Sequence, residues 1–233
     1  MRVRPLVGGY RHYRADRRVV RLVRAAGGGA DFPTMALISK GFVGRRRGDD
    51  GRTPPGQYLT KDFPVLAIGP APVVATDTWS FSVTSESGET REWTWDEFAA
   101  LPHETPTVDI HCVTKWSKLD TSWNGVSLDL LLDGMDTDAG YVVVHGYDGY
   151  TTNLPLEDLR DGKAWVVTEF DGVPLTREHG GPARLLVPHL YFWKSAKWVS
   201  RIELTVDNEQ GFWERGGYHD YGDPWREQRY QGD

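Results

Sequence analysis

Residues 108–117 read VDIHCVTKWS and carry the only cysteine of the 233-residue chain, Cys112. The first part of this stretch carries the β-branched residues Val108, Ile110 and Val113, which predicts a strand over residues 108–113 with Cys112 near its end. A polar loop is expected to follow, and binding or reacting side chains often lie on loops at strand ends. Because neighbours on a strand point to opposite faces, His111 is poorly placed to act as a base for Cys112.

The rest of the chain alternates short apolar runs with turns rich in glycine and proline. Thr94 and Glu97 form a capping-box pattern that opens a short helix, which Pro102 ends. Strands are expected at residues 81–84, 90–93, 141–145, 165–168, 184–187 and 201–206, and further helical turns at 127–132 and 156–159. These helices are shorter than βαβ crossovers need, so the pattern predicts an α+β fold: a single domain with a mixed sheet, short helices and long loops.

Residues 1–34 differ from the rest in charge. They hold eight arginines and two aspartates, a net charge of +6, whereas the other 199 residues hold 19 basic and 31 acidic side chains, a net charge of −12. The acidic part argues against nucleic acid as a partner. We interpret residues 1–34 as a disordered basic tail, or as a stretch upstream of a natural start at Met35, residues 35–54 as a polar loop, and residues 55–233 as the functional domain.

Composition excludes several kinds of protein. No apolar stretch is long enough for a membrane span. The pair Arg17-Arg18 is typical of a twin-arginine export signal, but Arg21 and Arg24 interrupt the apolar run that should follow, so we expect a cytoplasmic protein. One cysteine allows no internal disulfide, no all-cysteine zinc site and no haem-attachment motif. Cys112 is then either a small buried hydrophobe or a site residue.

Two motifs resemble a known family. The sequence HCVTKWS at residues 111–117, followed by WNGVSL at 123–128, resembles the molybdenum-binding segment of the sulfite oxidase superfamily, and most closely the branch with the catalytic subunit of bacterial methionine sulfoxide reductase. HGGPARLLVP at 179–188, running into KSAKWV at 194–199, is a second match, and GQYLTKDFPV at 56–65 is a weaker third. Two motifs at compatible spacing are more specific than one. The resemblance implies the mixed-sheet molybdopterin-binding fold of that superfamily.

The resemblance also implies a cofactor, Mo-molybdopterin, and the residues that bind it. Cys112 is the implied metal ligand and catalytic centre, since a soft thiolate suits such a metal. Arg184 and Lys197 match positions that anchor the phosphate of the pterin. Gly146 stands where the reductase branch has a threonine, so a side-chain contact is in doubt there. The implied cofactor-binding residues are Thr60, Lys61, Asp62, Cys112, Gly146, His179, Arg184, Ser195, Ala196 and Lys197.

Alternatives remain for several residues. Arg184 and Lys197 could form surface salt bridges, and His179 could be a hydrated loop histidine. The aromatic stretch at residues 213–225 could pack on the domain, or it could bring Tyr218, His219 or Trp225 to the rim of the site.

Ser117 stands where sulfite oxidases carry the arginine that holds sulfite. We therefore expect an oxidoreductase that transfers an oxygen atom to or from a small S-oxide or N-oxide and uses a separate electron-transfer partner, with neither haem nor nucleic acid. The alternatives are a non-catalytic molybdopterin carrier, a true sulfite oxidase and, least favoured, a cysteine hydrolase.

Overall fold

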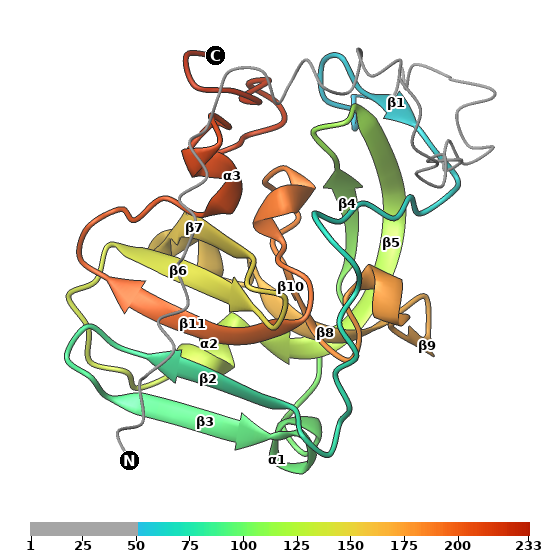
Figure 1. Cartoon of the computed structure of the whole chain (residues 1–233). Helices are drawn as coiled ribbons and strands as arrows, with labels where there is room; N and C mark the ends of the chain where they lie inside the picture. The colour runs from blue at the N-terminus through green and yellow to red at the C-terminus, as the bar shows by residue number, and fades with distance from the viewer. Residues whose placement is uncertain (1–50) are drawn as a thin grey trace, which may run out of the picture. The chain divides into compact units, whose positions relative to one another are not determined.

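The computed structural model of the chain describes residues 51–233 (Figure 1). The interpretation of residues 1–34, and most of the loop expected at 35–54, lie outside these residues. Within the described part, no helix has the length and apolar character needed to cross a membrane.

One of two sheets has five strands in the order β3-β2-β11-β6-β7. Its members are β2 (Ser80–Thr84), β3 (Thr90–Thr94), β6 (Tyr141–Gly146), β7 (Thr151–Pro155) and β11 (Val199–Thr205). Strand β11 runs parallel to β2 and antiparallel to β6, so the sheet is mixed.

The second sheet has six strands and contains the cysteine motif. The order β1-β5-β8-β10 forms its main path, with β4 paired to β5 and β9 paired to β8. The bounds are β1 (Tyr58–Leu59), β4 (Thr107–His111), β5 (Trp116–Ser127), β8 (Trp165–Phe170), β9 (Val173–Pro174) and β10 (Arg184–Leu186). Because β1 is parallel to β5, this sheet is mixed too. The α+β class is confirmed, with the strands divided between two sheets.

The helices are short, as expected. They are α1 (Trp95–Ala99), α2 (Leu128–Leu132) and α3 (Phe212–Arg215), together with the 3₁₀ turns η2 (Leu156–Leu159), η3 (Arg177–His179) and η4 (Phe192–Lys194). The capping box at α1 is confirmed: the Thr94 hydroxyl accepts from the Glu97 N–H, and the Glu97 carboxylate accepts from the Thr94 N–H. Such a cap satisfies N–H groups that the first helical turn leaves free.

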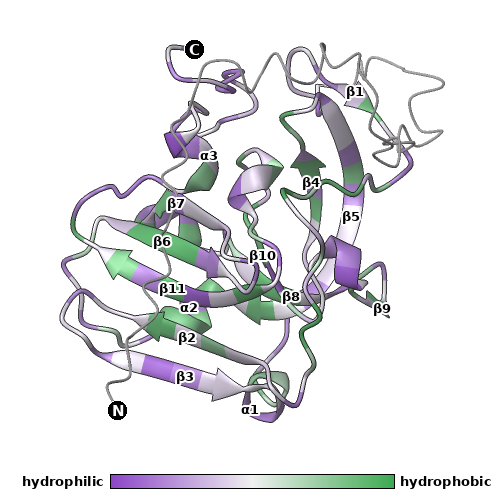
Figure 2. Cartoon of the chain, viewed as in Figure 1, coloured by the Kyte–Doolittle hydropathy of each residue, from purple (hydrophilic) through white to green (hydrophobic). Residues whose placement is uncertain are grey.

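Two hydrophobic clusters hold these elements together. The larger one includes Phe81, Val144 and Ile202 from the five-stranded sheet, and Figure 2 shows β6 largely hydrophobic, β11 alternating between hydrophobic and polar residues, and the edge strand β3 more polar. The smaller one surrounds β4 and β5 and includes Cys112 and Trp116. The cysteine therefore lies at the border of a packed aromatic cluster.

The polar loop expected after Cys112 is only a short turn. A turn of four residues, Cys112–Lys115, leads at once into β5, the longest strand described. Polar side chains such as Lys118 and Asp120 give this segment no apolar pattern typical of a strand. In the structure it pairs with β1, β4 and β8 and buries Trp116 and Trp123. Strand β7 was also missed. Cys112 consequently sits in a tight hairpin turn that backbone pairing fixes on both sides.

Candidate functional site

Cys112 follows the last residue of β4 and begins the hairpin turn. Its N–H donates to the Trp116 carbonyl at 2.8 Å, and its carbonyl accepts from the Lys115 N–H at 2.9 Å. The residue is 6% exposed, and its Sγ lies 3.1 Å from Oγ1 of Thr114. Burial raises the pKa of the thiol, and the Thr114 hydrogen bond and the charge of Lys197 offset this only in part. The thiol therefore keeps its proton at neutral pH unless a cation replaces it.

Lys197 is the cation that acts on this thiol. Its ammonium group donates to the carbonyl of Leu66 at 2.7 Å and to that of Glu178 at 2.6 Å. Burial, reinforced by the charge of Arg184, lowers the pKa of Lys197 to about 7. Carbonyl oxygens fix the position of the ammonium group without neutralising it.

Arg184 begins β10 and is 1% exposed. Its guanidinium donates to the carbonyls of His179 and Ser195, each at 2.8 Å, and lies 4.2 Å from the ring centre of Phe192. Burial lowers its pKa. Among residues 51–233 neither Arg184 nor Lys197 forms an ion pair with a carboxylate, so the surface salt-bridge alternative is wrong for Arg184. Arg184 and Lys197 lie on either side of Gly180 and repel each other's charge, so a bound anion would be stabilised beside them.

His179 connects this pair to the loop after β1. Its Nε2 donates to the Phe63 carbonyl at 3.0 Å, so Nδ1 must accept from the Thr176 hydroxyl, also at 3.0 Å. The ring stacks on Phe63 at 4.0 Å, and burial lowers the pKa of the imidazole. His179 is therefore a neutral, oriented side chain rather than a hydrated loop histidine.

The glycine after His179 allows the chain to approach the cations closely. Gly180 has φ of +103°, and a Cβ there would lie 3.0 Å from the Lys197 Cβ and 3.1 Å from the Arg184 Cβ. The His-Gly-Gly-Pro motif thus has a physical cause, since a larger residue would push the two cations out of place.

The remaining candidates on the η4 turn act mainly through the backbone. The Ser195 hydroxyl accepts from the Val187 N–H at 2.9 Å, while the Ser195 carbonyl holds Arg184. Ala196 is buried, and its carbonyl accepts from the Leu185 N–H. This turn leads from β10 in one sheet to β11 in the other (Figure 1), so the site lies where the chain passes between the sheets.

Gly146 ends β6 beside the same turn. A Cβ at this position would lie 2.6 Å from Oδ1 of Asp148 and 2.8 Å from the Lys197 carbonyl. The missing hydroxyl therefore has a structural cause: no side chain fits between the β6–β7 turn and Lys197.

The weak motif after β1 forms the far side of the site. The Asp62 N–H donates to the Thr60 hydroxyl at 3.1 Å, and Lys61 and Asp62 are exposed. Phe63 and Leu66 reach the site instead, through the carbonyls that hold His179 and Lys197. Sequence reasoning missed both, because a contact made by a carbonyl leaves no mark on residue type.

The C-terminal strap, defined here as residues 211–229, reaches the cysteine turn. Burial raises the pKa of Tyr218 to about 12, and the nearby charges of Tyr230 and Cys112 act in the same direction. The ring of Trp225 packs edge-on against His111, with centroids 6.2 Å apart. The strap thus packs on the domain, and Tyr218 lies within electrostatic reach of the thiol. His219 accepts hydrogen bonds from the N–H groups of Tyr221 and Gly222, within the strap itself.

His111 does not serve Cys112. Its Nδ1 lies 2.8 Å from the hydroxyl of Ser117 across the β4–β5 pair, and burial lowers its pKa to about 4. Because the Cys112 thiol faces Thr114 instead, the geometry does not support a cysteine hydrolase. Ser117 is itself fully buried, so its side chain is not available to a ligand.

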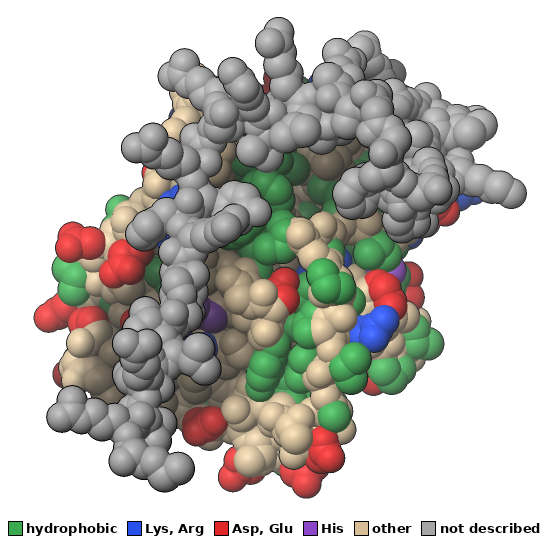
Figure 3. Space-filling model, viewed as in Figure 1, with side chains coloured by type: hydrophobic (Ala, Val, Ile, Leu, Met, Phe, Trp, Pro, Cys, Tyr) green, Lys and Arg blue, Asp and Glu red, His purple; other side chains and the backbone are tan. Residues whose placement is uncertain are grey.

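The described surface is rich in acidic groups. Figure 3 shows red carboxylates along the edges of one face, with few basic side chains among them. Exposed apolar residues also occur in the loop after β1, namely Val65, Leu66, Ile68 and Val73. Arg184 is thus buried and Lys197 partly buried, whereas the charged groups visible in Figure 3 are mainly acidic.

Known proteins resemble the chain over most of its length. The family described as "Oxidoreductase molybdopterin binding domain" matches residues 68–213. An uncharacterized oxidoreductase of Bacillus subtilis (strain 168), YuiH, is 43% identical over 197 residues, which cover 82% of this chain and 100% of that protein. A putative protein-methionine-sulfoxide reductase subunit of Azospira oryzae, YedZ1, is 30% identical, covering 72% of this chain and 66% of that protein.

More distant relatives are longer proteins. Human mitochondrial sulfite oxidase is 25% identical over 204 residues, which cover 71% of this chain but only 37% of the human protein. Among solved structures, the sulfane dehydrogenase SoxCD of Paracoccus pantotrophus has a similar fold, with a TM-score of 0.55 and 17% identity over 79% of this chain and 57% of that one.

Proposed function

Because the chain belongs to the family of oxidoreductases with a molybdopterin-binding domain, we propose that it transfers an oxygen atom to or from a small S-oxide or N-oxide at a molybdenum ion held by Cys112. One observation carries the proposal: a buried thiol lies within electrostatic reach of Lys197, whose pKa Arg184 lowers, and neither cation forms an ion pair with a carboxylate among the described residues. A thiolate and two cations are the groups that a thiophilic metal and a pterin phosphate require.

The residues present therefore fit the implied cofactor. In the proposal Cys112 ligates the metal, Lys197 and Arg184 hold the phosphate, and His179 and the Ser195–Ala196 backbone line the pterin. Thr60, Lys61 and Asp62 form the outer edge, and Gly146 contributes space rather than a hydroxyl. When bound, the cofactor supplies two-electron redox chemistry and exchange of one oxygen atom with the substrate.

Cys112 must lose its proton when the metal binds. Burial favours the thiol, whereas the positive charge of Lys197 favours the thiolate. Bound phosphate would in turn favour protonated Lys197. Metal loading and phosphate binding are therefore coupled through the charge of one lysine.

Tyr218 is the side chain proposed to contact the substrate. Its raised pKa, about 12, keeps the phenol protonated at neutral pH. A protonated phenol can donate a hydrogen bond to the oxygen of a sulfoxide or N-oxide.

The substrate class follows from a missing charge. Ser117 is buried against His111, so no cation stands where a sulfite site needs one. An anion without a partner is costly in a partly dehydrated pocket. The similarity to the putative protein-methionine-sulfoxide reductase subunit of Azospira oryzae supports a neutral S-oxide as the substrate.

Steady-state kinetics on methionine sulfoxide and on sulfite test this class. We expect turnover of the sulfoxide and poor oxidation of sulfite. Efficient turnover of sulfite at micromolar concentration would contradict the proposal and favour the alternative of a true sulfite oxidase, with Lys115 or Lys118 as the substitute anion contact.

Electrons must come from a separate carrier in this proposal. A reduced viologen replaces that carrier in the assay, and a non-catalytic molybdopterin carrier would turn over no substrate. We also propose the cytoplasm as the compartment, because Arg21 and Arg24 break the export pattern; cell fractionation tests it.

A further inference from the structure

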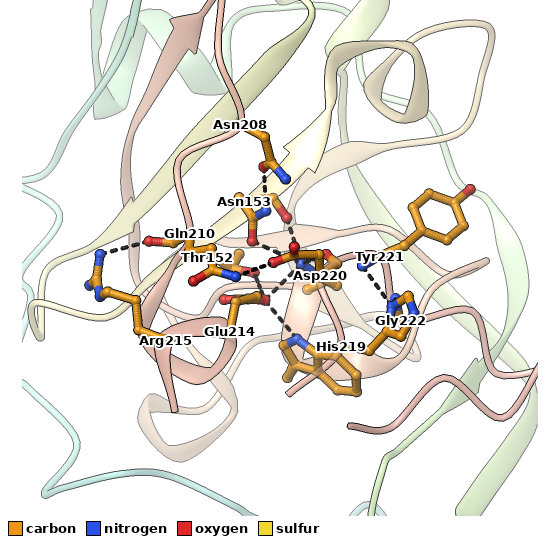
Figure 4. Close-up of polar contacts among 12 residues, drawn as sticks. Thr152, Asn153, Asn208, Gln210, Glu214, Arg215, His219, Asp220, Tyr221 and Gly222 are labelled. Carbon is orange, nitrogen blue, oxygen red and sulfur yellow. Dashed lines mark hydrogen bonds and ion pairs between the residues drawn. The ribbon is translucent and has the colours of Figure 1, made fainter. Parts of the chain in front are cut away.

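A buried ion pair ties the C-terminal strap to the domain. The side chains of Lys194, in η4, and Glu214, in α3, are both 0% exposed, and Nζ lies 2.7 Å from Oε1. Figure 4 shows the network around this pair. Lys194 also donates to the carbonyl and Oδ1 of Asn153 on β7, at 2.7 and 3.1 Å. The pair thus joins one sheet, the η4 turn and the strap.

The same ammonium group holds the strap at a second point. Lys194 donates to the carbonyl of Asp220 at 2.5 Å, and the Asp220 carboxylate accepts from Gln210 at 2.8 Å. Glu214 and Asp220 lie on either side of Tyr218 in the chain. One buried cation therefore fixes both ends of the short stretch that carries the phenol.

Trp193 connects this network to the ring of Tyr218. Its Nε1 donates to Oε1 of Glu214 at 2.9 Å, and its ring packs edge-on against Tyr218 with centroids 5.2 Å apart. The same oxygen accepts from the Thr152 hydroxyl at 3.0 Å. Three donors converge on one carboxylate oxygen, which is a strongly directional arrangement.

Packing around α3 leaves the strap little freedom. A Cβ on Gly211, the residue before α3, would lie 2.4 Å from the Cα of Thr152 and 2.6 Å from Oε2 of Glu214. The start of α3 is thus in close contact with β7, which fixes the position from which Glu214 reaches Lys194.

We propose that Lys194 and Glu214 are positioning residues, which hold the turn between Glu214 and Asp220 and so keep the ring of Tyr218 packed against Trp193, on the strap whose Trp225 packs beside the cysteine turn. A buried ion pair contributes little net stability compared with well-packed apolar residues, so stability alone does not account for its geometry. The inference rests on the proposed function only in taking the surroundings of Cys112 as the reaction site.

The test uses the full-length chain without cofactor, so that it does not depend on oxygen transfer. The double variant Lys194→Met/Glu214→Leu removes both charges and keeps an apolar core, and Arg226→Met, an exposed change in the same strap, is the matched control. We expect the double variant to fold but to melt below the wild type, because Trp193, Thr152 and the carbonyls of Asn153 and Asp220 lose a hydrogen-bond partner. A ¹⁹F label on the ring of Tyr218 should nevertheless shift toward the free-tyrosine position, and alkylation of the Cys112 thiol should become about tenfold faster as the strap opens locally.

A folded double variant with the wild-type ¹⁹F shift and alkylation rate would overturn the proposal. If the double variant does not fold, Trp193→Phe decides instead, because it keeps an aromatic ring and removes one donor to Glu214. A smaller change of both signals in the same direction supports the proposal, and wild-type signals overturn it. A chain that binds no molybdenum would contradict the proposed function but leave these readings valid.

Discussion

The ammonium group of Lys197 lies 2.7 Å from the carbonyl oxygen of Leu66, which stands 131 positions earlier in the chain. This hydrogen bond ties the loop after β1 to the turn between the two sheets. Its second bond, to the Glu178 carbonyl, ties in the η3 segment. Three distant parts of the sequence thus converge on one cation whose charge has no carboxylate partner in the described part of the chain.

Retention of cofactor should depend on both cations. Lys197→Met removes a charged hydrogen bond, and Arg184→Lys removes the fork geometry of the guanidinium. For each variant we expect a loss of cofactor affinity of about 1.5–3 kcal/mol, or roughly 10–100-fold. Pterin content after gel filtration measures this loss. Lys163→Met, which removes an exposed lysine bound to the Glu157 carbonyl, is the control. Full pterin retention in both site variants would assign the two cations a purely structural role.

The stability of the cofactor-free protein should depend on pH through Lys197. Burial lowers its pKa from the ordinary 10.5 to about 7, so between these values the unfolded chain binds a proton that the folded chain does not. Stability contributed by this group therefore rises with pH across that window. Urea unfolding at about pH 6.5 and about pH 9.5 should show the wild type gaining stability relative to Lys197→Met. A constant difference between the two proteins would refute this.

Gly146 should tolerate no side chain. In Gly146→Ala the new Cβ meets Asp148 and the Lys197 carbonyl well inside van der Waals distance, so we expect a loss of about 1–3 kcal/mol from overpacking. Gly140→Ala is the matched control, because its Cβ would lie 3.6 Å from its nearest neighbour, the Val206 carbonyl. Thermal melts compare the two. Equal melting temperatures of the two variants would show that the turn at Lys197 moves to accept the new methyl group without loss of stability, and would contradict the prediction.

Tyr218→Phe should separate binding from turnover. The ring still packs against Trp193 and Trp213, so metal content should stay at the wild-type level. Loss of the phenol hydrogen bond should lower kcat by about tenfold or more. Steady-state kinetics with metal analysis on the same sample measure both. Unchanged kcat would remove Tyr218 from the proposed substrate contact.

The local patterns predicted much of the fold because they depend on near neighbours. The α1 capping box lies within four residues, and β4, which ends at His111, is a short stretch with the β-branched residues Val108 and Ile110. Strand β5 was not predicted because two of its partners, β1 and β8, are distant in the chain, so long-range pairing rather than local composition makes it a strand. Lys194 also misleads sequence reasoning, since a lysine is expected at the surface and this one is fully buried.

The candidate site was predictable where side-chain type carries the chemistry, as for Cys112, Arg184 and Lys197. In the structure Lys197 and Arg184 lie on either side of Gly180 and the charge of Lys197 acts on the Cys112 thiol, while their roles toward a cofactor stay predictions. The site was not predictable where backbone groups make the contacts, as the carbonyls of Phe63 and Leu66 do. Nor was it predictable at Gly146, where neighbouring atoms leave no space for a side chain.

The molybdenum content of Cys112→Ala, purified from cells that make the cofactor, tests the central claim most directly. The residue lies in a turn held by backbone hydrogen bonds, so the variant should stay folded. Wild type should carry close to one molybdenum per chain, and Cys112→Ala little or none; Cys112→Ser should keep some pterin with altered activity, because oxygen is a harder ligand than sulfur. A full equivalent of molybdenum in Cys112→Ala, with the spectrum of the wild type, would contradict the assignment of Cys112 as the metal ligand.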